Sequence, residues 1–402
     1  MFNNPFEYKK PFVLFLFLFV FTCISAQVIT GAEQPDKYLP MLHNKRVALA
    51  VNPTSMIGGM HLVDSLKKHK IKITAILAPE HGFRGNAEAG ASIKSGMDKK
   101  TKLPVISLYG KHKKPTPQDL SKVDIVVFDM QDVGARFYTY ISTLHYIMEA
   151  CAENNKPLLV LDRPNPNGFY VDGPVLDPKF SSFIGMHPVP IAHGMTIGEY
   201  AQMINGEGWL NKGLACKLTV IKMENYDHNT RYNLPVKPSP NLPTMESVYL
   251  YPSICLFEGT NFSLGRGTST PFECVGKPGL KSGTYTFTPR SIKGVADNPP
   301  YMNKECKGFL LTAFAKNVFP ANPRIYLSWL IDLYHQDTAQ LSFFTPFFDK
   351  LAGTDQLRLQ IVAGKSEEEI RKSWQADLRK FRDMRLKYLL YKDFSVIYSS
   401  EK

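Results

Sequence analysis

The sequence predicts an α/β fold in which a Rossmann-like, doubly wound and mostly parallel sheet is followed by a smaller α+β domain. Short apolar runs recur between residues 46 and 223, with polar and amphipathic segments between them. Their spacing of roughly 20 to 35 residues leaves room for a helix between successive strands, and continuous Val, Ile and Leu runs are typical of strands buried on both faces. Beyond about residue 300 the pattern becomes mainly helical.

The expected elements follow in chain order. The apolar runs that predict strands are 46–51 (RVALAV), 73–77 (ITAIL), 105–108 (VISL), 124–128 (DIVVF), 158–161 (LLVL) and 218–223 (LTVIKM). Residues 61–70 and 140–155 have the amphipathic pattern of helices between strands. Further helical patterns cover 328–336 and 366–390, and the second opens with a Ser-x-x-Glu capping box at Ser366 and Glu369.

The first 26 residues have the three-part pattern of a secretory signal. Two lysines precede an apolar run at 12–21, and small residues end at Ala26, after which cleavage is expected. A run of this length cannot span a bilayer, which needs roughly 20 apolar residues. Cys23 offers lipid attachment as an alternative, although the Phe and Thr before it match such sites poorly. We therefore expect an exported protein, periplasmic or secreted, without a membrane span.

The remaining chain is long enough for two domains, expected at 27–235 and 236–402, with a Gly-rich junction loop at 255–275. The formal net charge of +12 favours an anionic partner such as cell-wall glycan, a membrane surface or acidic polysaccharide, unless it serves only solubility. Nucleic acid is not expected, because no Lys/Arg stripe with interleaved aromatics is present. Five cysteines remain beyond the signal, an odd number without a CxxC pair, so we expect no disulfide framework.

Several common cofactor and metal motifs are missing. The first strand is followed by NPTSMIGG rather than GxGxxG, and no P-loop, HExxH or GxSxG elbow occurs. We therefore expect no cofactor and no metal.

Polar side chains follow the predicted strands. In doubly wound sheets, ligands gather at the carboxyl ends of the strands. The polar residues at these positions are Asn52, Thr54, Ser55, Glu80, His81, Tyr109, Asp129, Gln131, Asp132, Asp162, Arg163 and Asn165. This edge of the sheet is therefore the predicted functional edge.

Longer motifs extend from the same positions. They are PEHGFRG (79–85), DMQDVGARFYTYISTL (129–144), DRPNPNG (162–168), GPVLDP (173–178), PIAHGMTIGEYAQMIN (190–205), the segment 238–273, and LAGTDQLRLQIVAGKSEEEI (351–370). With these motifs the chain resembles, over nearly its whole mature length, the bacterial exo-acting β-N-acetylmuramidases. The resemblance implies a glycoside hydrolase that removes N-acetylmuramic acid from the non-reducing end of peptidoglycan fragments, MurNAc-GlcNAc type saccharides. It also implies an active-site cleft between a Rossmann-like and a smaller C-terminal domain.

Glycosidic cleavage generally needs a proton donor and a second group. Glu80 is the expected general acid, and an ion pair with Arg84 or Arg136 is its structural alternative. Candidates for the second group are Asp132, Asp129 and Glu258.

Alternatives remain open for these carboxylates. Asp132 could be a helix N-cap, and Asp129 could anchor the strand end. The substrate's own acetamido oxygen could also act as nucleophile, so that a carboxylate or Tyr138 would only orient it.

The expected substrate-binding residues are His81, Arg84, Arg136, Tyr138, Arg163, His193, Asn261 and Arg266. A guanidinium such as Arg163 or Arg266 suits the lactyl carboxylate of muramic acid. Tyr138 could stack on the sugar, while His81 and His193 could bind hydroxyls. A non-catalytic glycan-binding protein is the alternative function, and a cell-wall amidase or esterase is a third, which the missing elbow and zinc spacing disfavour. The sequence makes no prediction of oligomeric state.

Overall fold

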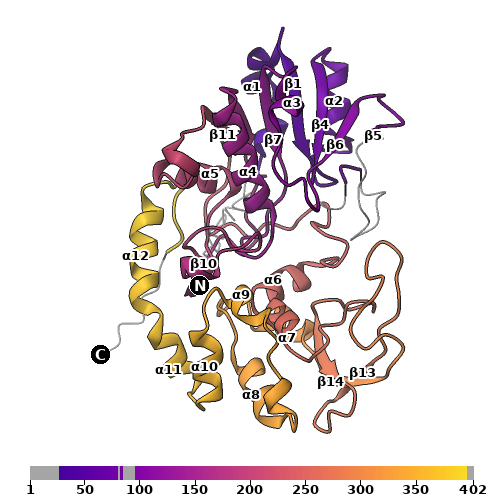
Figure 1. Ribbon diagram of the computed structural model, residues 1–402, viewed down its shortest axis with the longest axis vertical. Coiled ribbons are helices and arrows are strands. Elements are labelled where there is room, and N and C mark those ends of the chain that lie inside the picture. The colour runs from indigo at the N-terminus through magenta and orange to yellow at the C-terminus, as the bar shows by residue number, and fades with distance from the viewer. Residues whose placement is uncertain (1–26, 80–81, 85–95, 396–402) are drawn as a thin grey trace, which may run out of the picture.

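The computed structural model describes residues 27–79, 82–84 and 96–395. Its largest sheet has seven strands in the order β11-β8-β7-β1-β4-β6-β5 (Figure 1). Six strands run parallel, and β5 pairs antiparallel with β6 at one edge. The strands are β1 (Arg46–Val51), β4 (Lys72–Ala78), β5 (Gly96–Met97), β6 (Pro104–Ser107), β7 (Ile125–Asp129), β8 (Leu158–Leu161) and β11 (Leu218–Ile221).

The order of the parallel strands defines the fold. The first strand in the chain, β1, lies at the middle of the sheet between β4 and β7, and the later strands extend outward on either side. This is the strand order of a doubly wound α/β sheet. All six apolar runs form strands, which confirms the predicted fold class, a mostly parallel sheet with a smaller second domain.

Both faces of the sheet are covered, which explains the continuous apolar runs. On β1, Val47, Leu49 and Val51 pack in one core with α1 and α2, whereas Ala48 and Ala50 face the other core with α4 and α5. The second core continues without interruption into the C-terminal part of the chain. The helices of this domain are α1 (Pro35–Leu42), α2 (Leu62–Lys68), α3 (Pro117–Leu120), α4 (Tyr140–Glu153) and α5 (Ile197–Gly206).

The C-terminal part is built on a three-stranded antiparallel sheet in the order β12-β14-β13. Its elements are α6 (Met245–Ile254), β12 (Cys274–Lys277), β13 (Tyr285–Phe287), β14 (Cys306–Leu310), α7 (Thr312–Asn317), α8 (Ser328–Gln336), α9 (Phe348–Ala352), α10 (Gln356–Val362), α11 (Glu367–Ser373) and α12 (Gln375–Leu386). The predicted capping box of Ser366 and Glu369 is present at the start of α11. The helical pattern at 366–390 is divided at Trp374, which is buried between α11 and α12.

The last helix returns to the first domain (Figure 1). Arg385 of α12 donates to the Gly194 carbonyl over 2.7 Å. Beyond the helix, the Tyr391 hydroxyl donates to Asp162 over 2.7 Å, and the Leu390 amide donates to Glu199 over 2.9 Å. The C-terminal segment thus supplies hydrogen bonds to two buried carboxylates of the first domain.

The five cysteines between 151 and 306 are all buried and free. Among the residues that the structure describes, no helix is both long and apolar enough to cross a membrane.

Candidate active site

The carboxyl ends of β1 and β7 form the switch point of the sheet, where ligands bind in doubly wound folds. The loops that follow these strands are joined by hydrogen bonds. The Gln131 amide donates to Thr54 Oγ1 over 3.0 Å, and the Ser55 hydroxyl donates to the Asp129 carbonyl. The Gln131 side chain also donates to the Pro164 carbonyl over 2.6 Å, which adds the loop after β8. The polar residues that follow three separate strands therefore form one platform.

Asp129 and Arg163 neutralise each other beneath this platform. The Arg163 guanidinium donates to both carboxylate oxygens, with Nη2–Oδ2 at 2.9 Å, and also to the Met56 carbonyl. The side chain of Asp129 is 0 % exposed and that of Arg163 is 5 % exposed. The structure therefore gives Asp129 the anchoring role that the sequence left open, and it leaves Arg163 little capacity for a substrate carboxylate.

Asp132 differs from Asp129 because one of its oxygens is free. Its Oδ2 accepts from the Gly134 amide over 2.7 Å, in a turn where Gly134 has φ +77° and a side chain would collide with Asn165. Its Oδ1 is buried without a hydrogen-bond partner among the described residues. Helix α4 begins at Tyr140 with Thr139 as N-cap, so the N-cap alternative for Asp132 is wrong.

His193 lies beside Asp132 and is also incompletely satisfied. Its Nδ1 accepts from the Met195 amide over 3.3 Å, which leaves the proton of the neutral ring on Nε2. Nε2 is 3.7 Å from Asp132 Oδ2 and has no hydrogen-bond partner in the described part of the chain. A buried donor and a buried acceptor without partners are costly in a folded protein. This pair is the strongest sign of a polar ligand site at the functional edge.

Two other arginines that the sequence assigned to substrate binding have structural partners. Arg84 makes four hydrogen bonds of 3.0 to 3.2 Å to Asp64 and Asp98, and its ion pair lowers the pKa of Asp64 to about 2. Because these contacts are with carboxylates of the protein itself, the role of Arg84 in substrate binding stays a prediction without support.

Arg136 is completely buried, and burial lowers its pKa to about 9. Arg136 instead joins the two parts of the chain. Its guanidinium donates to four backbone carbonyls over 2.6 to 3.0 Å. They belong to Pro174, Val189, Leu351 and Ala352. The last two are at the C-terminal end of α9, where a cation is favoured by the helix dipole. These contacts correct the expectation that Arg136 binds substrate, because backbone carbonyls already take both terminal nitrogens of its guanidinium.

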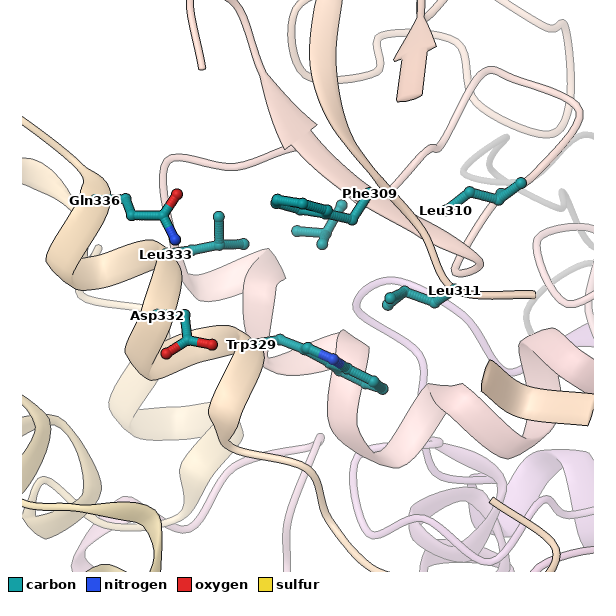
Figure 2. A pocket seen from close by; sticks show the side chains of 8 residues that line it. Phe309, Leu310, Leu311, Trp329, Asp332, Leu333 and Gln336 are labelled. Carbon is teal, nitrogen blue, oxygen red and sulfur yellow. The ribbon is translucent and has the colours of Figure 1, made fainter. Parts of the chain in front are cut away.

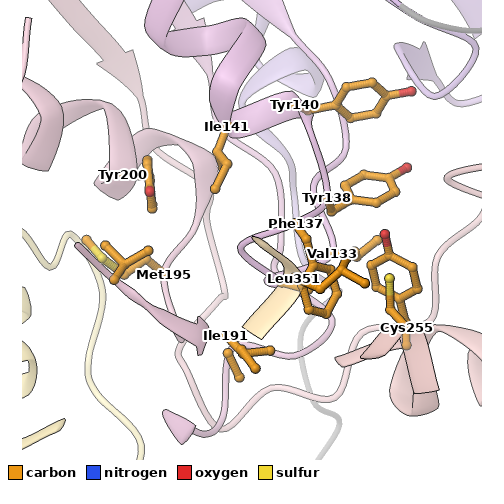
Figure 3. Packing of buried hydrophobic residues seen from close by; sticks show 14 of the residues in the cluster. Val133, Phe137, Tyr138, Tyr140, Ile141, Ile191, Met195, Tyr200, Cys255 and Leu351 are labelled. Carbon is orange, nitrogen blue, oxygen red and sulfur yellow. The ribbon is translucent and has the colours of Figure 1, made fainter. Parts of the chain in front are cut away.

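An aromatic row leads from Asp132 toward the second domain. Tyr138 packs edge-on against Tyr251 of α6 at a centroid distance of 5.8 Å, and Tyr251 contacts Phe272 at 5.1 Å. Figure 3 shows the hydroxyls of Tyr138 and Tyr140 projecting toward the same side. Burial raises the pKa of Tyr138, with neighbouring Tyr140, Tyr251 and Asp132 acting in the same direction. Its hydroxyl donates to the Pro238 carbonyl over 2.7 Å, so Tyr138 is held in place.

Glu258 and Arg266 lie at the far end of this row. Arg266 is 4.8 Å from the Phe272 ring centroid, and its Nε donates to Glu258 Oε1 over 2.8 Å. The side chain of Arg266 is 32 % exposed and that of Glu258 is 24 % exposed, whereas the Asp129–Arg163 pair is buried. Tyr251, which the sequence did not single out, therefore links the two sets of predicted residues. Only its place within the motif 238–273 could have indicated it.

Three predicted residues remain. Asn261 donates to Asp337 over 2.8 Å within the C-terminal domain, and its backbone carbonyl accepts from Tyr301. Glu80 and His81 lie outside the described residues.

Other features of the structure do not coincide with the predicted site. A cavity of about 220 Å³ lies between α8 and the C-terminal sheet, where Phe309, Leu311 and Trp329 surround it (Figure 2). None of the predicted site residues for which the structure gives a position lines this cavity. Within the described residues, no group of three or more His, Cys, Asp or Glu side chains could hold a metal ion.

Comparison with known proteins identifies the family. Residues 47–246 match the N-terminal model of exo-beta-N-acetylmuramidase NamZ, and residues 249–391 match the C-terminal model. The peptidoglycan beta-N-acetylmuramidase NamZ of Bacillus subtilis (strain 168) is 42 % identical over 391 residues, 92 % of this chain and 93 % of that protein.

Two crystal structures of DUF1343 family proteins from Bacteroides fragilis NCTC 9343 have the same architecture. The first has a TM-score of 0.85 and 49 % identity, and covers 92 % of this chain and 100 % of its own. The second has a TM-score of 0.78 and 30 % identity, with coverages of 91 % and 99 %. The two adjacent family matches and these relatives show that the chain belongs to the exo-β-N-acetylmuramidase NamZ family.

Proposed function

We propose that this chain is a glycoside hydrolase that acts on peptidoglycan as an exo-β-N-acetylmuramidase. The match to both halves of the family and the name of the Bacillus subtilis relative support this activity. The more specific substrate that we propose is the non-reducing-end N-acetylmuramic acid of MurNAc-GlcNAc type saccharides. The observation that carries the assignment to this edge of the sheet is the unsatisfied Asp132–His193 pair at the switch point.

Glu80 and Asp132 are the carboxyl groups to which we assign the reaction. Glu80 follows β4, which neighbours β1 in the sheet, and we propose it as the general acid. Its structural alternative was an ion pair with Arg84 or Arg136, but Arg84 already pairs with Asp64 and Asp98, and both terminal nitrogens of Arg136 donate to backbone carbonyls. Asp132 is the second group, because Arg163 occupies both oxygens of Asp129 and Arg266 occupies an oxygen of Glu258.

The geometry at Asp132 suits an acetamido group. Its free Oδ1 is an acceptor for the acetamido N–H, while His193 Nε2–H can donate to a neighbouring oxygen of the sugar. Hydrogen bonds of this kind fix the group's orientation before cleavage. Asp132 would thereby steady either an incoming water or the acetamido oxygen itself.

Arg266 is our candidate for the lactyl carboxylate. It is the more exposed of the two arginines suggested by the sequence, and its contacts with Glu258 use Nε and Nη2. A guanidinium retains further donors in this arrangement, and it suits paired hydrogen bonds to a carboxylate. Arg163 is nearly buried and already neutralised by Asp129.

We also propose that the protein is exported, with residues 1–26 as the signal and the periplasm or the exterior as its location. The basis is the pattern of the N-terminal sequence. A peptidoglycan substrate outside the cytoplasm agrees with this destination.

The test is product analysis of a MurNAc-GlcNAc disaccharide by chromatography, with Glu80→Gln and Asp132→Asn as variants. We expect free N-acetylmuramic acid from the wild type. Loss of a general acid costs about 10²- to 10⁴-fold in rate, and we expect this range for Glu80→Gln. Asp349→Asn, in the partly exposed pair with Arg358, serves as the control for loss of a carboxylate and should keep wild-type turnover.

Binding without turnover, or release of peptide or acyl groups instead of the sugar, would overturn the proposed activity. Near-normal hydrolysis by Glu80→Gln would remove that residue from the mechanism. Near-normal hydrolysis by Asp132→Asn, with Asp129→Asn inactive but folded, would transfer the second role to Asp129.

A further inference from the structure

The sheet has a second surface at its opposite end. Parallel strands all start at the same edge, so the loops that precede them lie side by side, away from the candidate active site. We call this surface the amino edge. It consists of residues 43–46, 67–72, 99–102, 121–124, 153–156 and 212–217, which precede β1, β4, β6, β7, β8 and β11.

Hydrogen bonds confirm that these loops are neighbours. The Arg46 amide donates to Asp124 over 2.7 Å, and Lys67 Nζ donates to the Thr101 carbonyl over 3.2 Å. On the other side, the amide of Leu158 donates to the Lys217 carbonyl over 2.9 Å. The amino edge is therefore a continuous surface. Six strands at about 4.8 Å spacing give it a width of roughly 25 Å.

The positive charge of the protein is concentrated on this surface. The amino edge contains thirteen lysines and arginines but only two acids, Asp124 and Glu153, in a chain with a formal net charge of +12. The basic residues are Lys45, Arg46, Lys67, Lys68, Lys70, Lys72, Lys99, Lys100, Lys102, Lys122, Lys156, Lys212 and Lys217.

Most of this charge is not neutralised within the protein. Arg46 forms an ion pair with Asp124, and Lys100 forms one with Asp64. Glu153 forms its ion pair with Lys114, which is not part of the amino edge. The other eleven basic residues have no ion-pair partner among the residues that the structure describes, and all but the half-buried Lys156 are exposed. So dense a set of free charges on one face favours a polyanionic partner.

Two exposed methionines beside the amino edge favour a lipid surface over a soluble polyanion. Met97 of β5 is 62 % exposed beside Pro104 at the start of β6, and Met41 in the last turn of α1 is 37 % exposed. Both lie in segments that border the amino edge. Apolar side chains among lysines gain from the boundary between headgroups and acyl chains, whereas a soluble charged polymer offers them no apolar phase.

We propose that the amino edge binds the surface of an anionic lipid bilayer. The six residues of β1 at about 3.3 Å each separate the two ends of the sheet by roughly 20 Å. The candidate active site at the carboxyl edge thus faces away from the lipid, where it can receive glycan. Lipid binding and hydrolysis use opposite ends of the same strands.

Sedimentation with vesicles tests this proposal on the mature chain, residues 27–402. Vesicles of about 30 % phosphatidylglycerol in phosphatidylcholine should bind the protein, and pure phosphatidylcholine should not. Raising NaCl to about 1 M, where the Debye length is about 3 Å, should release it. Absence of binding to the anionic vesicles at low salt overturns the proposal.

Charge reversal locates the surface. The combined changes Lys68→Glu, Lys70→Glu, Lys102→Glu and Lys122→Glu should weaken vesicle binding at least about a hundredfold, since each lysine near the surface contributes about fivefold. The matched control reverses four exposed lysines outside the amino edge, Lys304, Lys307, Lys365 and Lys372. An equal loss in both variants would show that only net charge matters and would reject the amino edge.

Two further measurements complete the test. Thermal unfolding of both variants should match the wild type, because all eight lysines are exposed. Met97→Ser should weaken vesicle binding and leave binding to soluble polyphosphate unchanged. If polyphosphate binds but vesicles do not, the partner is a soluble polymer and the lipid proposal is wrong.

Discussion

Arg163, which follows β8, donates hydrogen bonds to both carboxylate oxygens of Asp129 at the end of the neighbouring β7. Neither side chain is more than 5 % exposed. Two residues that the sequence offered as a catalytic group and a substrate-binding group are thus one neutral structural unit. Their pairing fixes the ends of two central strands, on which the Asp132 turn is built.

The first prediction concerns this pair. Asp129→Asn leaves the Arg163 charge buried and unpaired, so the free energy of unfolding should fall by about 3 to 5 kcal/mol. Urea denaturation of the wild type and the variant measures this difference in the free energy of unfolding. The control is Asp349→Asn in the partly exposed pair with Arg358, where we expect a loss of no more than about 1 kcal/mol. Equal small losses in the two variants would contradict the structural role.

The second prediction concerns the junction between the two parts of the chain. Arg136→Lys keeps the charge but loses the planar fork that reaches four carbonyls, so buried acceptors are left without donors. Unfolding should become easier by at least about 2 kcal/mol. Arg358→Lys, at a partly exposed site, is the matched control and should change little. A stable Arg136→Lys variant with reduced affinity for substrate would restore the binding role.

The third prediction is a pH dependence. Burial and the nearby Glu199 raise the pKa of Asp162 to about 6, from an ordinary value of 3.8. Because the folded protein holds this proton more tightly than the unfolded chain, the contribution of Asp162 to stability is complete below about pH 4. This stabilisation is lost as the pH rises through 6. Raising the pKa from 3.8 to about 6 corresponds to about 3 kcal/mol in the free energy of unfolding.

The measurement compares wild type with Asp162→Asn, which cannot titrate. The difference in unfolding free energy, wild type minus variant, should fall by about 3 kcal/mol between pH 4 and pH 7. Asp64→Asn is the control of opposite sign. The pKa of Asp64 is lowered to about 2, so its difference should stay flat above about pH 5 and fall only in stronger acid. A pH-independent difference for Asp162→Asn would show that this carboxyl titrates normally.

Much of the fold was predictable because its signals are local. A strand buried on both faces is apolar at nearly every position, as β7 and β8 are, and all six apolar runs became parallel strands. The capping box at Ser366 is another local signal, since its partners are three residues apart. The end of α11 at Trp374 was not predictable, because the helical periodicity continues through a residue that is turned into the core.

The site was less predictable because its distinctions depend on distant partners. The sequence placed Asp129, Asp132 and Glu258 together as candidates, but only the contacts show that Arg163 takes both oxygens of Asp129 and that Asp132 Oδ1 is buried without a partner in the described part of the chain. The four carbonyls that accept from Arg136 are between 38 and 216 positions away in the sequence, and no local sequence pattern predicts such contacts. Polar residues at strand ends therefore predicted one edge of the sheet as the site without revealing which of them already have partners.

The docking of the C-terminal segment has a consequence for how the two parts of the chain fold. Tyr391 and Leu390 donate to Asp162 and Glu199, two carboxylates that are 0 % exposed in the first domain. Because these donors follow the second domain in sequence, the first domain receives its full set of hydrogen bonds only when the second domain is in place. We therefore expect the two parts of the chain to unfold together.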